Sequence, residues 1–591
     1  MPLPNPTQIK PAPDISHDAD ALRELSRTHT DWFISIDGRA PWSVNNDEFE
    51  FSAAHGRLIF SCWTETGSST WHVRSWNWTG EKLALQASRR MGAELAALEL
   101  IPHASAKAIV AGIAAARQER CERLAQLVAE GLGVGDRVLG VEERKGLGSR
   151  AKGSEAKSSR QTSGRDRKEA IRTDLLRPTS GTATSVNLQP TSNPLHPFID
   201  SLSPSVKIER ATLSRGMRRD QPGRYARIIL RKLHERIAVT GIVAESDVRN
   251  VDSLFSSTLL WFQRLLASPK RPAIQRLVLV VERSILEGAR QRHVLLRDSL
   301  RRRIELVMVD EHWREISSLP QFERRQLWRK RLTRFPPVNE AEGSDRAAEI
   351  VAHAPEAIDV VASRHGQTLR YHGLPFARVR CVLNQDRIWF GIEGSRRRSL
   401  DEYHTRDWLK LLRDLGEYRN ADCRDRRHWL YRASGEAWLE SILRRDITKL
   451  DPGLIIAPLH AQFRTSHGGA VGFQGGARPI DLLALRHDGR LVVIELKVFE
   501  DREHVFQGVD YWRRVEAHRR RGHISSAKLF GDRDITDESP LVYLVAPTLH
   551  FHPSFRTLAQ TIAPDIEIYR FDINEDWRRG VRVVRRERVN A

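Results

Sequence analysis

The chain has 591 residues, more than one hydrophobic core normally serves, so its length predicts about three or four domains. Hydrophobic residues make up 40% and charged residues 29%, a composition that excludes a wholly disordered chain. A formal net charge of +20 favours a polyanionic partner, with nucleic acid as the leading candidate. A basic disordered tail and a membrane-surface patch are the alternative explanations of this charge.

The cysteines and the first residues bear on location. No C-x-x-C pair is formed by the four widely spaced cysteines, Cys62, Cys121, Cys381 and Cys423. Their spacing favours neither a zinc ribbon nor a disulfide framework. The start, MPLPNPTQIKPAPD, has proline where a signal peptide is apolar, and no apolar run of about 18 residues occurs. We therefore expect a cytoplasmic protein that does not cross a membrane, with its oligomeric state open and a dimer as one option.

Residues 1–142 are assigned to an N-terminal α+β domain. The strand-like runs RLIFSCW, STWHVRSWNW and EKLALQA are separated by Gly, Ser and Thr, and an Ala-rich helical pattern spans about 104–132. Six tryptophans gather here: Trp32, Trp42, Trp63, Trp71, Trp76 and Trp78. Their apolar strand contexts favour core packing over the alternative, which is stacking on unpaired bases.

Residues 143–195 are rich in Ser, Gly, Thr, Lys and Arg and nearly free of apolar side chains. Such a segment cannot bury enough apolar surface to fold alone. We predict a disordered basic linker that acts as a solvated tether, with non-specific phosphate contact by its basic first half as the alternative.

An α/β domain of unreadable function is assigned to 196–335. Strands YARIILRK, RIAVTGIV, RLVLVVER and IELVMVDE alternate with helical patterns at about 246–267 and 284–302. No Gly-rich phosphate loop is present in it. After the polar stretch FPPVNEAEGSD, a connecting α+β region covers 345–430, and the last domain covers 431–591.

The last domain contains two apolar runs, IDLLAL and LVVIEL, joined by RHDGR, which predicts a hairpin of buried central strands. Three charged residues interrupt it: Asp481, Glu495 and Lys497. Burial of these groups is costly unless they are paired or bind a cation. Either a structural ion-pair cluster or a cation site is therefore expected.

The length of the hairpin loop decides whether these residues meet, because opposed or evenly spaced positions share a face. A two-residue loop would set Asp481 opposite Leu496, on the wrong face. A three-residue loop ending in Gly489 sets Asp481 opposite Glu495 and needs glycine in the left-handed conformation at its last position. We predict this longer loop, which brings Lys497 to the same place.

Two facing carboxylates suit a hard cation such as Mg²⁺ or Mn²⁺, which binds oxygen ligands and retains water. A metal held by Asp481 and Glu495 would activate water and neutralise charge that develops on a phosphodiester. Lys497 would hold the attacking water or stabilise the pentavalent phosphate.

P-I-D at 479–481 and E-L-K at 495–497 resemble the motif of the PD-(D/E)xK superfamily of restriction-endonuclease-like nucleases. The run IDLLALRHDGRLVVIELK is similar to archaeal and actinobacterial endonucleases that cut mismatched or branched DNA. The resemblance covers about the last 160 residues of the sequence. It implies an αβββαβ core, a central mixed sheet flanked by helices, within a multidomain chain of the α/β class.

The resemblance also implies roles for the flanking helices. The upstream helix, SGEAWLESILRRD, would present a glutamate to the metal. Glu436 is favoured because it lies nearer the edge of the buried stripe, with Glu440, or solvent exposure of both, as alternatives. Downstream, the helix at about 501–520 carries Gln507 and Tyr511, similar to the Q-x-x-x-Y motif of the RecB-like branch, in which the glutamine orients water or DNA.

The downstream helix ends in a cluster of arginines. We predict that Tyr511 and these arginines contact nucleic acid, a solvated basic face being the alternative; they are Arg513, Arg514, Arg519, Arg520 and Arg521. IIAPLHAQFR is predicted as the first strand of the sheet and PLVYLVAPTL as a later buried strand, with IEIYRFDIN and VRVVRRERV as extensions.

The sequence thus predicts a nuclease, dependent on Mg²⁺ or Mn²⁺, that hydrolyses phosphodiester bonds in DNA during repair, recombination or defence. The alternatives are a catalytically silent nuclease-fold DNA-binding protein and an interaction scaffold. No zinc-type spacing links the histidines of this region, His460, His467 and His487.

Overall fold

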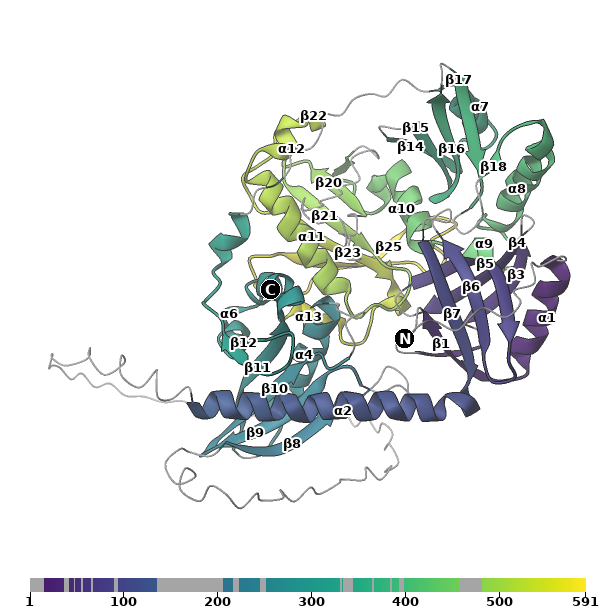
Figure 1. Ribbon diagram of the computed structural model, residues 1–591. Helices are drawn as coiled ribbons and strands as arrows, with labels where there is room; N and C mark the ends of the chain where they lie inside the picture. Colours follow the sequence, from purple (N-terminus) through teal and green to yellow (C-terminus); the bar gives the residue numbers. More distant parts are fainter. Residues whose placement is uncertain are drawn as a thin grey trace, which may run out of the picture.

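The computed structural model describes four β-sheets with their helices (Figure 1). None of the helices it describes is long and apolar enough to cross a membrane. The described residues combine helices and sheets, as the α/β class predicts at this coarse level. The described residues are 15–36, 42–46, 48–54, 57–64, 67–89, 94–134, 206–215, 223–244, 251–270, 272–329, 332, 344–363, 366–382, 385–392, 398–457 and 481–591.

The N-terminal region is a seven-stranded antiparallel sheet of order β2-β1-β7-β6-β5-β4-β3, packed against α1 (Ile15–Arg27). Trp32 and Trp71 are buried in its core, and Trp32 Nε1 donates to the Ser26 carbonyl at 3.0 Å. For these two residues the core assignment is confirmed. The strands are Asp31–Ile36, Trp42–Asn45, Phe49–Ala54, Arg57–Thr64, Gly67–Trp78, Leu83–Arg89 and Glu94–Pro102, of which the sequence indicated only β4, β5 and β6.

The long helix α2 (His103–Val134) links the first sheet to the second, as Figure 1 shows. Cys121, Leu124 and Val128 are buried against Ile228 and Val239 of the second sheet. The second half of α2 therefore packs with the following domain, which the predicted boundary at residue 142 did not anticipate.

The second sheet has the order β13-β12-β11-β10-β9-β8, with parallel pairing of β10, β11 and β12. The predicted helix at 284–302 is wrong in one respect, because it is two helices, α5 and α6. Between them Leu296 pairs with Ile562 in an isolated bridge, so this stretch bonds to the C-terminal domain instead of continuing the helix. The elements are β8 Lys207–Leu213, β9 Ala226–Lys232, β10 Glu235–Gly241, α4 Val251–Leu266, β11 Ile274–Glu282, α5 Arg283–His293, α6 Asp298–Arg301, β12 Ile304–Val309, β13 Ile316–Ser318 and the 3₁₀ helix η3 Arg324–Trp328.

The third sheet is antiparallel, of order β14-β15-β16-β17-β18, and its core includes Phe376, Ile388, Trp408 and Leu411. Helices α7 and α8 cover one side of it, and its other side faces α10 (Figure 1). The elements are α7 Asp345–Ala352, β14 Ile358–Ser363, β15 Gly366–Tyr371, β16 Leu374–Val382, β17 Gln385–Phe390, β18 Arg398–Ser399, η4 Glu402–His404 and α8 Thr405–Tyr418.

The C-terminal sheet has the order β19-β20-β21-β23-β24-β25, with β20 and β21 forming the predicted hairpin. Strands β21, β23 and β24 are parallel, and the two predicted extensions, β24 and β25, are confirmed. One side packs on α10 and the other on α11. The elements are α9 Trp429–Arg432, α10 Gly435–Arg445, η5 Ile447–Lys449, β19 Leu454–Ile456, β20 Leu482–Arg486, β21 Leu491–Leu496, α11 His504–Arg519, α12 His523–Ser526, β22 Leu529–Asp532, β23 Leu541–Pro547, η7 Thr548–His550, α13 Phe555–Ala559, β24 Ile568–Ile573 and β25 Val583–Arg588.

The second and fourth sheets share one hydrophobic core. Leu254, Phe255 and Ile285 lie in the same buried cluster as Val505 and Trp512 of α11. Burial of apolar surface across this boundary stabilises the two domains as a unit. The predicted linker at 143–195, and most of the predicted first strand beyond residue 457, lie outside the described residues.

Candidate active site

The hairpin of β20 and β21 has the predicted register. Leu482 lies opposite Ile494, and Leu485 lies opposite Leu491. Gly489 ends a three-residue loop, with a φ of +79° and its N–H donating to the Arg486 carbonyl at 2.9 Å. The loop length inferred from glycine is thereby confirmed, because a left-handed residue at this place favours glycine.

Continuing that register by one residue sets Asp481 opposite Glu495 at the open end of the hairpin. The Asp481 carboxylate accepts from the backbone N–H of Leu496 at 2.9 Å. Lys497 Nζ donates to Glu495 Oε1 at 2.8 Å, and only 1% of Glu495 is exposed. The three residues selected from the sequence therefore lie together.

The electrostatics of this group are dominated by negative charge. Burial, and next the Glu495 charge, raise the pKa of Asp481 well above its usual value. Burial also raises the pKa of Glu495, although Lys497 opposes the shift. For Lys497 burial would lower the pKa, but the surrounding carboxylates outweigh it and raise it. One ammonium thus serves several carboxylates, and Glu495 Oε2 is buried with no hydrogen-bond donor among the described residues.

The upstream helix α10 brings Glu436, not Glu440, to the site. Glu436 Oε1 lies 3.5 Å from Lys497 Nζ, and its side chain is 44% exposed. Glu440 instead pairs with Arg370 at 3.2 Å and with Arg444 at 2.7 Å. The preference for Glu436 agrees with this geometry, although the contact that Glu436 makes is with the Lys497 ammonium.

Helix α11 lines the other side of the site. Gln507 Nε2 donates to Asp501 Oδ2 at 3.2 Å, and that same oxygen lies 3.9 Å from Lys497 Nζ. His504 Nε2 lies 3.2 Å from the Glu495 carbonyl, and burial, then the Lys497 charge, lower the pKa of His504 to about 3. Asp501 and His504 were not predicted as site residues. They follow Lys497 by only four and seven residues, and this short separation could have indicated that they lie near it.

Most residues of the predicted nucleic-acid-contacting edge of α11 are bonded within the protein. Tyr511 is 4% exposed and packs in the core with Leu483 and Val493. The arginines are held by carboxylates or carbonyls: Arg513 and Arg514 by Asp510, Arg519 and Arg520 by Glu516, and Arg521 by Ala517 and Trp328. Of these pairs only that of Arg520 leaves the side chain about half exposed, at 48%.

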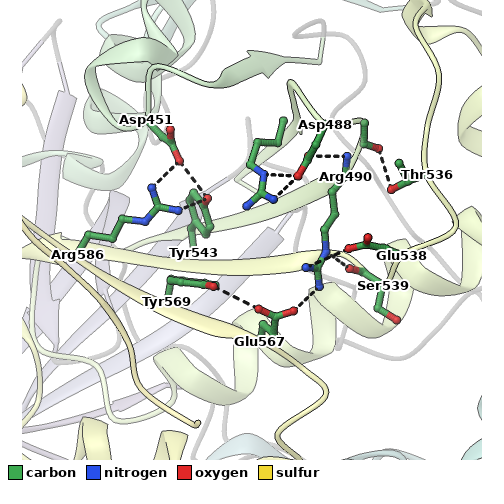
Figure 2. A network of polar contacts seen from close by, with 12 residues as sticks. Asp451, Asp488, Arg490, Thr536, Glu538, Ser539, Tyr543, Glu567, Tyr569 and Arg586 are labelled. Carbon is green, nitrogen blue, oxygen red and sulfur yellow. Dashed lines mark hydrogen bonds and ion pairs between the residues drawn. The ribbon is translucent and has the colours of Figure 1, made fainter.

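The frame around the site is fixed by further arginines. Arg444 donates to the Asp481 carbonyl at 2.9 Å and so ties α10 to the start of β20. At the loop end of the hairpin, Figure 2 shows Arg490 bonded to Glu567 at 2.7 Å and to the Ser539 carbonyl at 2.7 Å. These bonds tie the start of β21 to the residues that precede β23 and β24.

Among the described residues, no three His, Cys, Asp or Glu side chains converge as a metal-binding set. The described donors are thus two facing carboxylates, with Glu436 in contact with the Lys497 ammonium. Comparison of the chain with family models, with curated proteins and with solved structures finds no match. Function must therefore be inferred from the geometry of the site.

Proposed function

We propose that residues 431–591 form a PD-(D/E)xK-type nuclease domain that hydrolyses phosphodiester bonds in DNA with Mg²⁺ or Mn²⁺. One observation carries the proposal: a confirmed hairpin register that opposes Asp481 to Glu495, with Lys497 bonded to the second carboxylate at 2.8 Å. A buried carboxylate and a partly buried one side by side destabilise a fold unless something at the site compensates them.

The residues present fit a hard divalent cation. Asp481 and Glu495 would hold it, since carboxylate oxygens are the donors that Mg²⁺ and Mn²⁺ bind. The buried Glu495 Oε2, without a donor among the described residues, is the kind of atom that a cation satisfies. When bound, such a cation would activate water and neutralise charge on the phosphate.

The remaining residues act through position and charge. Lys497 presents an ammonium beside the carboxylates, where it would stabilise negative charge on the reacting phosphate. Oxygens of Asp501 and Glu436 lie 3.9 and 3.5 Å from that ammonium. Gln507 orients Asp501 through its amide and keeps Oε1 without a donor among the described residues, as a possible acceptor for water.

The order of elements gives further support. From α10 through β19, β20, β21 and α11 to β23, the domain follows the αβββαβ order that the resemblance implies. The site lies where β20 begins and β21 ends, so backbone hydrogen bonds of the sheet fix both carboxylates. We propose a restriction-endonuclease-like core on this basis.

A silent nuclease fold that only binds DNA is the second candidate. One observation favours it: the Lys497 ammonium already neutralises Glu495, which is 1% exposed. In that case Lys497 would take the place of a metal ion beside Glu495, and added metal would not produce cleavage.

The test is single-turnover cleavage of labelled DNA and RNA by the full chain, in Mg²⁺, in Mn²⁺ and with a chelator. We expect metal-dependent cleavage of DNA that Asp481→Asn abolishes. Asp532→Asn is the matched control, because that carboxylate is 88% exposed on β22 and remote in sequence from the motif. Equal cleavage by wild type and Asp481→Asn would refute the nuclease assignment.

A further inference from the structure

The side of the third sheet that faces α10 contacts that helix through Arg370 and Asp359, and the rest of this side is a separate face. We call it the outer face and define it by Thr368 of β15, Arg378 and Arg380 of β16, and Arg387 and Trp389 of β17. Register places them in two rows across the strands: Thr368 opposite Arg378 and Arg378 opposite Trp389, then Arg380 opposite Arg387. The alternate residues, such as Val379, Ile388 and Phe390, point into the core beneath α8.

The arginines of the outer face lack countercharges within the described residues. No described carboxylate pairs with Arg378, Arg380 or Arg387, and the Nε atoms of Arg378 and Arg380 are buried without a hydrogen-bond partner. Arg380 and Arg387 are directly opposed, an arrangement that costs stability when both carry the same charge. Burial, and next the charge of the neighbouring Arg380, lower the pKa of Arg378. The charges of Arg378 and Arg380 therefore also repel each other. An anion bound to this face would reduce the repulsion among these arginines.

Trp389 gives the face a second property. Its indole is half-buried and shares a row with Arg378, so its exposed part lies between strands that carry guanidinium groups. Aromatic side chains beside arginines on a sheet bind unpaired bases by stacking while the cations contact the phosphates. A duplex shields the faces of its bases, so this combination favours a single strand.

The outer face adjoins the proposed active site through α10. Arg370, two residues along β15 from Thr368, pairs with Glu440 at 3.2 Å. Glu440 lies about one helical turn from Glu436, which contacts Lys497, and Arg444 on the next turn bonds to the Asp481 carbonyl. Figure 1 shows α10 between the third sheet and the β20–β21 hairpin.

A hollow of about 470 Å³ opens at the same boundary. It is lined by residues of β14, of the end of α10 and of β19, among them Asp359, Arg444 and Ile456. Asp359, the acidic residue of β14 at this edge, is already neutralised by Arg445 at 2.8 Å. Asp359 therefore presents no uncompensated charge to a phosphate backbone at this edge.

We propose that the outer face of the third sheet binds single-stranded DNA, with phosphates on Arg378, Arg380 and Arg387 and a base stacked on Trp389, and directs the strand to the site beside α10. This deepens the proposed function and rests on it, because the nuclease site supplies the destination of the bound strand. The occupant is one polynucleotide strand; a duplex and an acidic protein segment are the alternatives that the test must exclude.

The test compares two double variants of the full chain that remove the same charge from opposite sides of one sheet. Arg378→Gln with Arg387→Gln alters the outer face, and Lys410→Gln with Arg413→Gln alters exposed positions of α8. Binding of a labelled oligothymidine and of a hairpin duplex is measured by fluorescence anisotropy in EDTA over a range of salt. Cleavage is measured in Mg²⁺ at limiting and at saturating enzyme.

We expect the outer-face variant to lose affinity for the single strand on the order of tenfold or more at low salt. Its slope of log affinity against log salt should fall by about 1.4, because two phosphate contacts are removed. The α8 variant should match wild type. Trp389→Leu should weaken single-strand binding about tenfold while leaving the salt slope unchanged, since stacking releases no counterions.

The outcomes separate this inference from the nuclease assignment. Metal-dependent cleavage by wild type, together with wild-type binding by the outer-face variant, would overturn the inference and leave the nuclease standing. If the outer-face variant loses binding but the wild type cleaves nothing, the nuclease assignment is refuted and the outer face remains the binding surface for a single strand. Equal losses in both double variants, or tighter binding of duplex than of single strand, would also overturn the inference.

Discussion

Two clusters of buried charge lie against α11, and they are compensated in opposite ways. At Asp510 three guanidinium groups meet one carboxylate: Arg292 at 2.8 Å, Arg513 at 2.8 Å and Arg514 at 2.6 Å. At Asp481 a carboxylate meets a second carboxylate, and one ammonium serves the group.

The pKa shifts follow that difference. Burial raises the pKa of both aspartates, but the three arginines reverse the shift at Asp510 and leave it well below its usual value. At Asp481 the Glu495 charge adds to burial, and Lys497 does not compensate. A fully paired buried carboxylate holds elements together, here α5 and α11, whereas a crowded one indicates a place for a further cation.

The largest expected effect is on cleavage. Asp481→Asn and Glu495→Gln should each slow single-turnover cleavage by roughly 10³- to 10⁴-fold, about 4–5 kcal/mol, because each removes one metal-ligand charge. Neither should lower the apparent melting temperature, since like-charge crowding is relieved. Paired cleavage and calorimetry measurements check this, and a large loss of stability would mean that the cluster is a structural ion pair instead.

Asp510→Asn should have the opposite pattern, with lower stability and nearly unchanged cleavage. Three buried guanidinium groups would lose their carboxylate, which costs about 3–5 kcal/mol of stability. We expect a lower urea midpoint and faster hydrogen exchange of the α11 amides, with cleavage per folded molecule little changed. A stable Asp510→Asn protein with abolished cleavage would show that this cluster belongs to the catalytic machinery.

The hairpin loop affects both stability and cleavage, because it sets the register that places Asp481 opposite Glu495. Gly489→Ala should cost about 1–2 kcal/mol, since alanine disfavours the left-handed conformation. It should also slow cleavage, because a Cβ there would lie 2.9 Å from the Asp534 carbonyl oxygen and push the loop. Gly531→Ala is the control: its φ is +68° and nothing lies within 4 Å of its Cβ, so it carries the conformational cost alone. Equal cleavage by both variants would indicate that the loop contact does not hold the site.

The difference between the clusters also explains what the sequence could predict. The register and the meeting of Asp481, Glu495 and Lys497 follow from local rules, namely strand alternation and one glycine. The pairing of the α11 arginines with Asp510 and Glu516 is also local, since these carboxylates lie three or four residues away on the same helix. Only the contribution of Arg292 to Asp510 could not be predicted, because Arg292 comes from α5, more than 200 residues earlier in the chain.

Other features depended on tertiary context in the same way. The second half of α2 packs on a sheet beyond residues 143–195, which no local pattern reveals. The break between α5 and α6 is caused by pairing with Ile562. The outer face of the third sheet emerges only when strand register shows that Arg378, Trp389 and Arg387 share it, because alternation alone does not say which side a helix covers.

The smallest expected effect concerns Gln507, which touches the crowded cluster only through Asp501. Gln507→Ala removes one hydrogen bond of 3.2 Å, a contribution of about 0.5–1.5 kcal/mol, so cleavage should fall about 2- to 10-fold. Because Gln507 is not among the proposed metal ligands, the Mg²⁺ concentration that gives half-maximal rate should stay at the wild-type value, whereas Glu495→Gln should raise it. Metal titrations of the residual activity distinguish these variants. A raised Mg²⁺ requirement in Gln507→Ala would place the amide oxygen in the ion-binding set and enlarge the site beyond the two facing carboxylates.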